Sequence, residues 1–237
     1  MTSLRTYATA LAATAALQVF CAPGGPAAAA TARPVPPPVA APAPAPAPAP
    51  AFRARVGAVP MAKLGRSWHP GCPVALRRLR LITMDHWGFD GRRHTGEMVV
   101  RDSAVRPMLH VFGKAFAAKF PIRQMRVLAE FGGDDEKAMA ADNTSAFNCR
   151  DVTGDPGRIS QHAYGDAVDI NTLENPYVDV HGRVHPAAGH RFLDRSRKAP
   201  GMIKRGDVIS RAMREVGWEW GGRWWMPDYQ HFSANGR

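Results

Sequence analysis

The sequence predicts an α+β domain, because strand-like and helical segments follow one another without the regular alternation of βαβ units. Residues 79–87 and 124–131 are short and rich in apolar or β-branched side chains, so we expect strands there and a third strand at 97–101. Apolar residues then recur at helical spacing between Val105 and Phe116. The expected architecture is a small antiparallel sheet flanked by helices.

Local signals mark the ends of two predicted helices. Ser103 is expected to cap the start of the first helix, and Pro121 to follow its end. The second helix is expected to begin near Asp207, to bury Val208, Ala212, Met213 and Val216, and to stop at Gly217. We expect the methionine and aromatic side chains on both helices to fill the core rather than to contact a cofactor.

The first 51 residues differ in composition from the rest of the 237-residue chain. Residues 1–32 carry Arg5, then an alanine-rich apolar run, then small residues at cleavage-site spacing, which is the order of a secretory signal peptide. The apolar run is short for a membrane span of about 20 residues, so an uncleaved anchor is only the alternative. Residues 33–51 are rich in alternating alanine and proline, which favours an extended, stiff linker. We therefore expect one folded domain at 52–237.

The chain is basic, and it keeps two cysteines beyond the predicted signal peptide. The chain has 31 Lys and Arg against 20 Asp and Glu, a formal net charge of +11. The basic residues are scattered, so we expect no nucleic-acid binding, and anionic cell-wall polymers are the more natural partners. After signal cleavage only Cys72 and Cys149 remain, and outside the cytoplasm such a pair most often forms a disulfide; two buried free thiols are the alternative. We expect a secreted or envelope-associated monomer without a membrane span after cleavage.

The segment SQHAYGDAVDIN, residues 160–171, gathers polar groups ahead of a predicted strand. If residues 167–170 form that strand, Asp169 points away from the face that packs on the core. A buried carboxylate is costly unless a charged partner meets it, and Gly165 would let the chain turn so that His162 approaches Asp169. One nitrogen and one oxygen ligand suit Zn²⁺. By itself, this spacing is more often a loop that runs into an ordinary strand.

A third ligand and a proton acceptor are expected in GWEWGGRWWMPDYQHFS, residues 217–233. A catalytic zinc needs three protein ligands and one open position, and His231 lies in a short, aromatic, β-like segment. Asp228 precedes His231 by three residues, and a carboxylate there can take a proton from water and deliver it to a leaving amine. Taken alone, His231 fits a packed or surface histidine and Asp228 a turn residue. Glu219 is the rival carboxylate for the proton transfer.

These motifs together resemble those of the zinc peptidases that include D-alanyl-D-alanine carboxypeptidases and L-alanyl-D-glutamate endopeptidases. The family pattern S-x-H-x-x-G-x-A-x-D is matched by Ser160, His162, Gly165, Ala167 and Asp169. The patterns W-G-G-x-W and D-x-x-H-F are matched by Trp220, Gly221, Gly222, Trp224, Asp228, His231 and Phe232. The resemblance extends over about Trp68 to Phe232, nearly the whole predicted domain.

The resemblance implies a hedgehog/D-Ala-D-Ala-peptidase-like fold and an exported metallopeptidase that hydrolyses a peptide bond in peptidoglycan stem peptides, as a carboxypeptidase or an endopeptidase. It implies Zn²⁺ held by His162, Asp169 and His231, with Asp228 as general base. Many members carry glutamate where this chain has Asp228, which puts the rate rather than the role in question. A family arginine ahead of the first motif stabilises the oxyanion, and Arg150 takes that part here; a surface salt bridge is its alternative. A non-catalytic, zinc-containing module that binds the cell wall is the alternative function.

Overall fold

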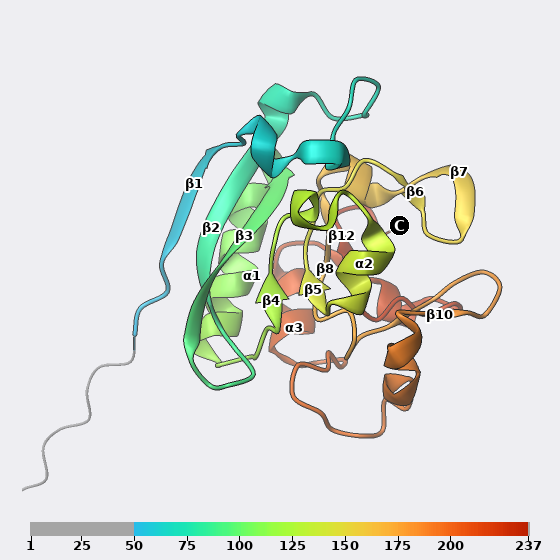
Figure 1. The fold of residues 1–237 in the computed structure, drawn as a ribbon. Coiled ribbons are helices and arrows are strands. Elements are labelled where there is room, and N and C mark those ends of the chain that lie inside the picture. Colours follow the sequence, from blue (N-terminus) through green and yellow to red (C-terminus); the bar gives the residue numbers. More distant parts are fainter. Residues whose placement is uncertain (1–49, 237) are drawn as a thin grey trace, which may run out of the picture. The chain divides into compact units, whose positions relative to one another are not determined.

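The first sheet has three antiparallel strands in the order β1–β2–β3 (Figure 1). The computed structural model describes residues 50–236, so the predicted signal peptide and nearly all of the predicted linker lie outside the described residues. The strands of this sheet are β1 (Ala54–Ala58), β2 (Leu79–Trp87) and β3 (Arg93–Arg101). β2 and β3 agree with the strands predicted at 79–87 and 97–101, although β3 begins earlier, at Arg93.

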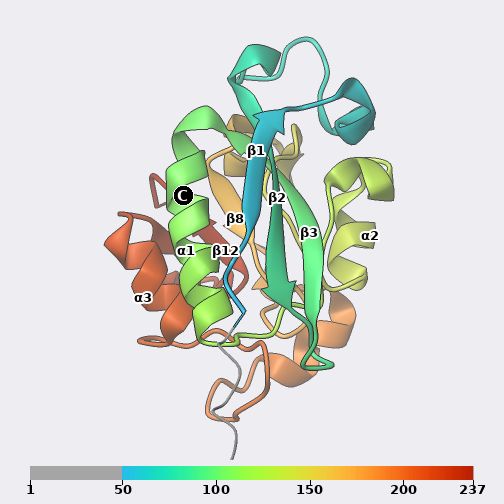
Figure 2. The same ribbon diagram turned by 90° about the vertical axis from the view of Figure 1, so that its left-hand side faces the viewer.

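Two helices lie beside this sheet, the first against the sheet and the second against the first helix (Figure 2). α1 (Val105–Ala117) packs against β2, and α3 (Val208–Glu215) packs against α1. α3 begins directly after Asp207, close to the predicted start, and the carboxylate of Asp207 caps the helix by accepting a hydrogen bond from a backbone N–H of the first turn. The prediction of Ser103 as the cap of α1 was wrong. Residues Asp102–Ala104 form a 3₁₀ turn that leads into α1, so Ser103 lies inside this turn and makes no cap.

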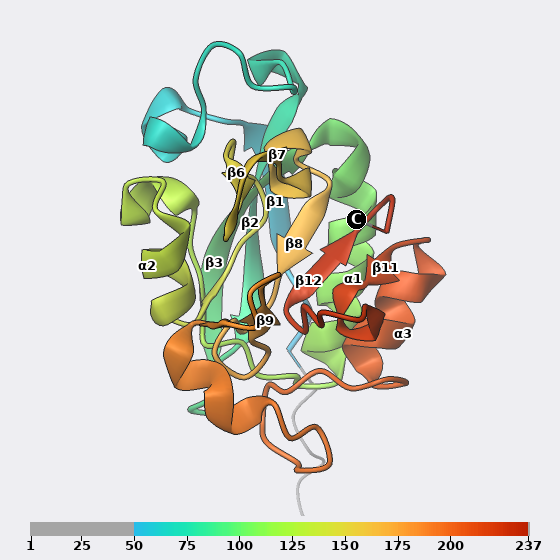
Figure 3. The same cartoon turned by 90° about the vertical axis from the view of Figure 1, so that its right-hand side faces the viewer.

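A second three-stranded antiparallel sheet, in the order β11–β12–β8, carries the motif residues (Figure 3). Its strands are β11 (Glu219–Trp220), β12 (His231–Ser233) and β8 (Ala167–Asp169). β8 agrees with the strand expected from the sequence at 167–170. Phe232 lies opposite Val168, and both side chains are fully buried, while the neighbouring pair His231 and Asp169 faces the other way.

The main hydrophobic core joins the two sheets to α1 and α3. It takes Met84 from β2, Phe112 from α1 and Met213 from α3, and it takes Ile170 and Phe232 from the second sheet and its end. Burying each such side chain stabilises the fold by about 1.5–3 kcal/mol. The strands that carry the polar motif residues are therefore fixed from behind by apolar packing.

The prediction of a strand at 124–131 was wrong for most of that segment. β4 (Gln124–Met125) pairs in parallel with β5 (Asn143–Thr144), and the chain then turns into a 3₁₀ helix at Leu128–Phe131. Val127 and Leu128 are nevertheless buried. A short apolar run indicates burial but does not by itself distinguish a strand from a helical turn.

The remaining elements are short and were not predicted. They are α2 (Asp135–Ala140), the hairpin β6 (Asp151–Val152) and β7 (Asp155–Ile159), and the hairpin β9 (Tyr177–Val178) and β10 (Val184–His185). Further 3₁₀ helices span Met61–Lys63, Gly65–Ser67, Leu76–Arg78, Gln161–Tyr164, Ala187–Phe192 and Gly221–Arg223. None of the helices in the described part of the chain has both the length and the apolar character needed to cross a bilayer.

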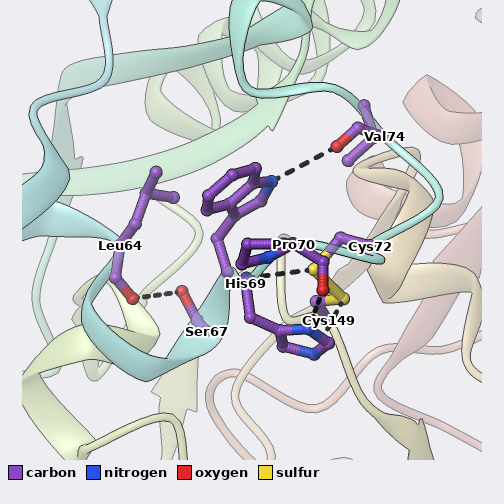
Figure 4. Close-up of a disulfide and its surroundings, with 8 residues drawn as sticks. Leu64, Ser67, His69, Pro70, Cys72, Val74 and Cys149 are labelled. Carbon is purple, nitrogen blue, oxygen red and sulfur yellow. Dashed lines mark hydrogen bonds between the residues drawn. A yellow bond between two sulfur atoms is a disulfide. The ribbon is translucent and has the colours of Figure 1, made fainter.

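A disulfide joins Cys72 to Cys149, with 5.8 Å between their Cα atoms and 77 positions between them in the sequence (Figure 4). His69 lies against both sulfurs: its backbone N–H donates to Sγ of Cys72 at 3.2 Å, and its Nε2 lies 3.5 Å from Sγ of Cys149. The backbone N–H of Cys149 donates to the carbonyl of Ser67 at 2.9 Å. The disulfide therefore ties residue 149 to the loop that precedes β2.

The segment 145–150, which ends just after this disulfide, connects the two sheets. Ser145 exchanges two backbone hydrogen bonds with Asp169 of β8, at 2.8 and 3.0 Å, and the N–H of Phe147 donates to the carbonyl of Val99 in β3. Both ends of the segment are thus fixed, one by the second sheet and the other by the disulfide.

Candidate active site

Three side chains of the motifs converge on one buried point. Nε2 of His162 lies 3.1 Å from Nδ1 of His231 and 3.1 Å from Oδ2 of Asp169. Nδ1 of His231 lies 3.2 Å from Oδ1 of Asp169. All three residues are buried. The structure therefore brings together the two histidines and the aspartate that the sequence motifs singled out, although 62 positions separate Asp169 from His231.

The backbone explains why these three side chains meet. His231 and Asp169 are Cα partners on the neighbouring antiparallel strands β12 and β8, so both side chains lie on the same face of the sheet. His162 lies in the 3₁₀ helix Gln161–Tyr164, whose N-cap is Ser160, and the hydroxyl of Ser160 accepts a hydrogen bond from the N–H of His162. The serine of the first motif thus fixes the start of the turn that carries the first histidine.

Gly165 ends that turn, as expected from the sequence, and two features of the structure require glycine there. Its φ of +72° lies in the left-handed region. A Cβ at this position would lie 2.7 Å from the backbone nitrogen of Arg101, which donates to the carbonyl of Gly165. This contact binds the turn to the end of β3 and sets the direction in which the chain enters β8.

The orientation of the His162 ring is fixed from the segment 145–150. Nδ1–H of His162 donates to the carbonyl oxygen of Ala146. In the neutral ring, with its proton on Nδ1, the lone pair on Nε2 points toward Asp169 and His231. A carbonyl that holds one ring nitrogen so that the other can bind a metal is the usual arrangement around metal-binding histidines.

Opposite charges stabilise one another within this cluster. Burial alone would raise the pKa of Asp169, but the imidazoles of His162 and His231 outweigh it and hold that pKa well below its ordinary value. Burial lowers the pKa of His162, whereas the Asp169 carboxylate more than compensates, so the pKa of His162 is raised. The carboxylate is therefore ionised at neutral pH and available as a ligand for a cation.

The donor set fits zinc. Zinc binds imidazole nitrogen and carboxylate oxygen at about 2.0–2.2 Å, so two ligand atoms of a tetrahedral site lie about 3.3–3.5 Å apart. The two imidazole nitrogens lie 3.1 Å apart, and each lies 3.1–3.2 Å from a different oxygen of the Asp169 carboxylate, so all of these separations are close to that value. The other compact group of possible ligands in the described residues, His69 with Cys72 and Cys149, has its sulfurs joined in the disulfide and offers no thiolate.

The cluster lies in the wall of a cleft of about 690 Å³, within the usual range for small-molecule sites. His162, Asp169 and His231 line this cleft together with Asp228 and Arg150. All five residues that the family resemblance assigns to zinc binding and catalysis therefore line one cavity. In Figure 3, β8 and β12 are seen side by side, with the hairpin β6–β7 beyond one end.

Asp228 is held in the cleft wall by the turn that leads into β12. Its N–H donates to the carbonyl of Gly221 at 3.1 Å, and a Cβ on Gly221 would lie 2.9 Å from the carbonyl oxygen of Asp228. The first glycine of the W-G-G-x-W motif therefore leaves room for Asp228. Burial raises the pKa of the Asp228 carboxyl to about 7, with Asp169 raising it further and His231 and Arg150 opposing. A carboxyl group with a pKa in this range can both accept and release a proton near neutral pH.

Glu219, the rival carboxylate, is outside the cleft. It lies on β11, opposite Ser233, and its side chain is exposed. It is absent from the residues that line the cavity. The geometry therefore favours Asp228 over Glu219 as a proton carrier.

Arg150 reaches the cleft from the residue after the disulfide. Its Nη2 lies 2.6 Å from Oδ2 of Asp135, the first residue of α2, and its Nη1 donates to the carbonyl of Asp151 at 2.8 Å. The hydroxyl of Thr153 donates to the same oxygen of Asp135 at 2.9 Å. The guanidinium is thus oriented by two partners and is not an isolated surface salt bridge, since only 20% of its side chain is exposed.

Asp135, which pairs with Arg150, is a residue of this site that the sequence motifs do not mark. It lies in the segment 134–140, where Asp134 caps the short helix α2 by accepting a hydrogen bond from the N–H of Lys137. That capping pattern was a usable signal for the helix. Nothing local in the sequence indicates that the following aspartate meets Arg150, because that contact depends on how α2 packs.

Comparison with known families agrees with these observations. A family model described as D-alanyl-D-alanine carboxypeptidase matches residues 153–234. The match includes His162, Asp169, Asp228 and His231, whereas Arg150 lies just ahead of it. No curated protein and no solved structure gave a significant match to the chain. The family match confirms the resemblance drawn from the two motifs.

Proposed function

We propose that this chain is an exported zinc metallopeptidase that hydrolyses a peptide bond in the stem peptides of bacterial peptidoglycan. The matched family supports a peptidase that acts on peptidoglycan. The observation that carries the proposal is the convergence of three buried side chains, whose facing nitrogen and oxygen atoms lie 3.1–3.2 Å apart, in a cleft that also contains Asp228 and Arg150. We further propose the hedgehog/D-Ala-D-Ala-peptidase-like fold, on the basis of the motif order and the small antiparallel sheet that carries two of the three proposed ligands.

His162, Asp169 and His231 would hold the metal ion in this proposal. When bound, zinc supplies Lewis-acid polarisation of the scissile carbonyl and activation of the attacking water. The protein contributes a rigid, prearranged donor set: two donors are fixed by strand pairing, and the third by the hydrogen bond from His162 to Ala146. Such prearrangement limits the conformational cost of binding the ion.

Asp228 and Arg150 would carry out the remaining steps. As water attacks the carbonyl carbon, Asp228 takes one of its protons and later delivers it to the amine nitrogen when the C–N bond breaks. The guanidinium of Arg150 donates hydrogen bonds to the carbonyl oxygen as negative charge develops there. The pair formed with Asp135 keeps the guanidinium in one orientation, so it need not reorganise during the reaction.

The test is digestion of purified peptidoglycan by the zinc-loaded protein, with mass spectrometry of the released peptides. The mass of the products identifies the bond and distinguishes carboxypeptidase from endopeptidase action. Asp228→Asn should lower the rate by about 10²–10⁴, the usual contribution of a positioned acid–base group, with little change in zinc content or melting temperature. Glu219→Gln is the matched control, because it makes the same chemical change outside the cleft, and we expect it to cost far less.

Two results would count against this assignment. If Asp228→Asn kept wild-type turnover while Glu219→Gln abolished it, the wrong carboxylate would have been assigned. If the zinc-loaded wild type cleaved no peptidoglycan fragment yet bound the intact wall, the chain would be a non-catalytic cell-wall-binding module instead.

A further inference from the structure

Exposed apolar side chains are concentrated at the mouth of the cleft. Among the described residues, six large hydrophobic side chains are exposed, and four of them line this cavity. They are Ile159, Val180, Trp225 and Met226. Exposed apolar side chains grouped at a cavity indicate an interaction site, whereas single ones scattered over a surface need no explanation.

These side chains come from three separate parts of the chain. Ile159 ends β7 and is 53% exposed, and Val180 follows β9 and is 50% exposed. Trp225 lies between the 3₁₀ helix Gly221–Arg223 and Asp228 and is 94% exposed. Figure 3 shows β6 and β7 on one side of β8 and β12, and β9 on the other. Because three independent loops supply the apolar groups, their grouping does not follow from one locally apolar sequence.

Trp225 is the largest of these groups. Among the described residues its indole makes no stacking contact with another ring, whereas the neighbouring Trp224 packs 5.5 Å from the ring of His231. A tryptophan buries more apolar area on binding than almost any other side chain and is a frequent anchor of binding sites. Trp225 is therefore positioned to contact a ligand that extends out of the cleft.

Polar side chains line the same cleft as the apolar ones. Arg158 precedes Ile159 and has 61% of its side chain exposed, and Asn235 donates to Gln161 at 2.9 Å. All three polar residues line the same cavity. A sugar ring presents a flat face of C–H groups and an edge of hydroxyl and acetamido groups, which matches a lining that offers both apolar and polar side chains. A lipid surface would instead favour a continuous apolar patch with basic residues around it.

We infer that the mouth of the cleft binds the glycan strand of peptidoglycan, with a pyranose ring stacked on the indole of Trp225. This inference rests on the proposed function, because it takes peptidoglycan as the substrate. Within that polymer the stem peptide offers mainly methyl groups, carboxylates and one long diamino acid, whereas the glycan offers the flat apolar face that an indole fits. The substrate is then a peptide still attached to its sugar rather than a free peptide.

The first experiment measures binding without catalysis. The full-length zinc-loaded protein is bound to beads that carry covalently immobilised glycan strands, from which an amidase has removed all peptides. Trp225→Ala should weaken this binding at least about tenfold, as the loss of an aromatic anchor does. Met61→Ala is the matched control, because Met61 is an exposed apolar residue outside the cleft, and it should bind like the wild type. Equal binding by wild type and Trp225→Ala would overturn the inference.

The second experiment compares two substrates of identical peptide sequence, one linked to its disaccharide and one free. Trp225→Ala should lower kcat/KM for the sugar-linked peptide about tenfold more than for the free peptide, mainly through KM. An equal loss on both substrates would mean that the indole contacts the peptide, and the inference would be wrong. If neither substrate is cleaved but glycan binding still depends on Trp225, the proposed peptidase activity fails and the sugar site remains. A change from dimer to monomer in Trp225→Ala would assign the patch to a second copy of the chain and overturn the inference.

Discussion

Removing the disulfide should destabilise the protein by an amount that the length of the closed loop sets. In the chain-entropy model, a crosslink lowers the entropy of the unfolded chain by about 2.1 + 1.5R ln n cal/mol/K. With a separation of 77 residues between Cys72 and Cys149, this gives about 15 cal/mol/K, or about 4.5 kcal/mol at 25 °C. For a domain of this size, such a loss lowers the melting temperature by about 9–18 °C. The variant to make is Cys72→Ala combined with Cys149→Ala.

The same variant should lose activity faster than it loses zinc. The disulfide holds the end of segment 145–150, and Arg150 follows Cys149 directly, whereas His231 and Asp169 are held by strand pairing. We expect kcat to fall several-fold at a temperature where the protein is still folded, with zinc content nearly unchanged. The change in melting temperature is measured by thermal unfolding of the double variant, and of the wild type with and without reductant. Zinc content is measured by elemental analysis.

Two outcomes would refute this reasoning about the disulfide. A melting temperature within about 2 °C of the wild type would mean that the crosslink does not constrain the unfolded chain as assumed. Loss of zinc in parallel with activity would mean that the segment supports the ligands as much as it supports Arg150.

The remaining predictions concern the metal, the arginine and one buried carboxyl group. Elemental analysis of the purified protein should find about one zinc per chain. His231→Ala should lose most of this zinc, because one of three donors is removed. Full zinc content in that variant would exclude His231 as a ligand. Asp135→Asn should lower kcat about tenfold or more with less effect on KM, because Arg150 loses a charged partner at 2.6 Å. Asp135→Glu keeps the charge and should restore part of the rate. If Asp135→Asn changed only the stability of the protein, Asp135 would have a purely structural role. Burial, together with the nearby Asp142 carboxylate, raises the pKa of Glu174 to about 8, from an ordinary value of 4.5. The folded state therefore binds more protons than the unfolded state between these values, and stability should fall as pH rises through that window. Glu174→Gln should remove this loss, so its melting temperature relative to the wild type should rise between about pH 5 and pH 8; a constant difference would contradict the shifted pKa.

The parts of the fold that could be predicted from the sequence are those in which local pattern and tertiary packing agree. β2 follows from its content of apolar and β-branched residues, and α3 from the apolar side chains that recur between Asp207 and Gly217, because both elements pack these side chains on the core. The segment 124–131 misled because its apolar residues are buried by a 3₁₀ turn, and a run this short has no period that distinguishes the two.

The candidate site divides in a similar way. His162, Asp169 and His231 are marked by motif spacing, and the structure brings them together. Asp135 is not marked, because its role depends on the packing of α2 against the segment that contains Arg150. In the sequence, Trp225 is only one member of an aromatic run, and nothing local indicates that its side chain is exposed, because exposure depends on the folded surface.

The pairing of His231 with Asp169 across two strands has a consequence for how this protein can vary. Because side chains alternate along a strand, a slip of β12 by one residue would bring Gln230 or Phe232 opposite Asp169 and turn the imidazole into the apolar core. Insertions in the loops on either side of β12 are therefore tolerable only when they leave this alignment intact. A metal ion, once bound, would discriminate among alignments, because only one of them delivers donor atoms from both strands. The bound ion would therefore stabilise the native strand register and no other register that the chain samples during folding.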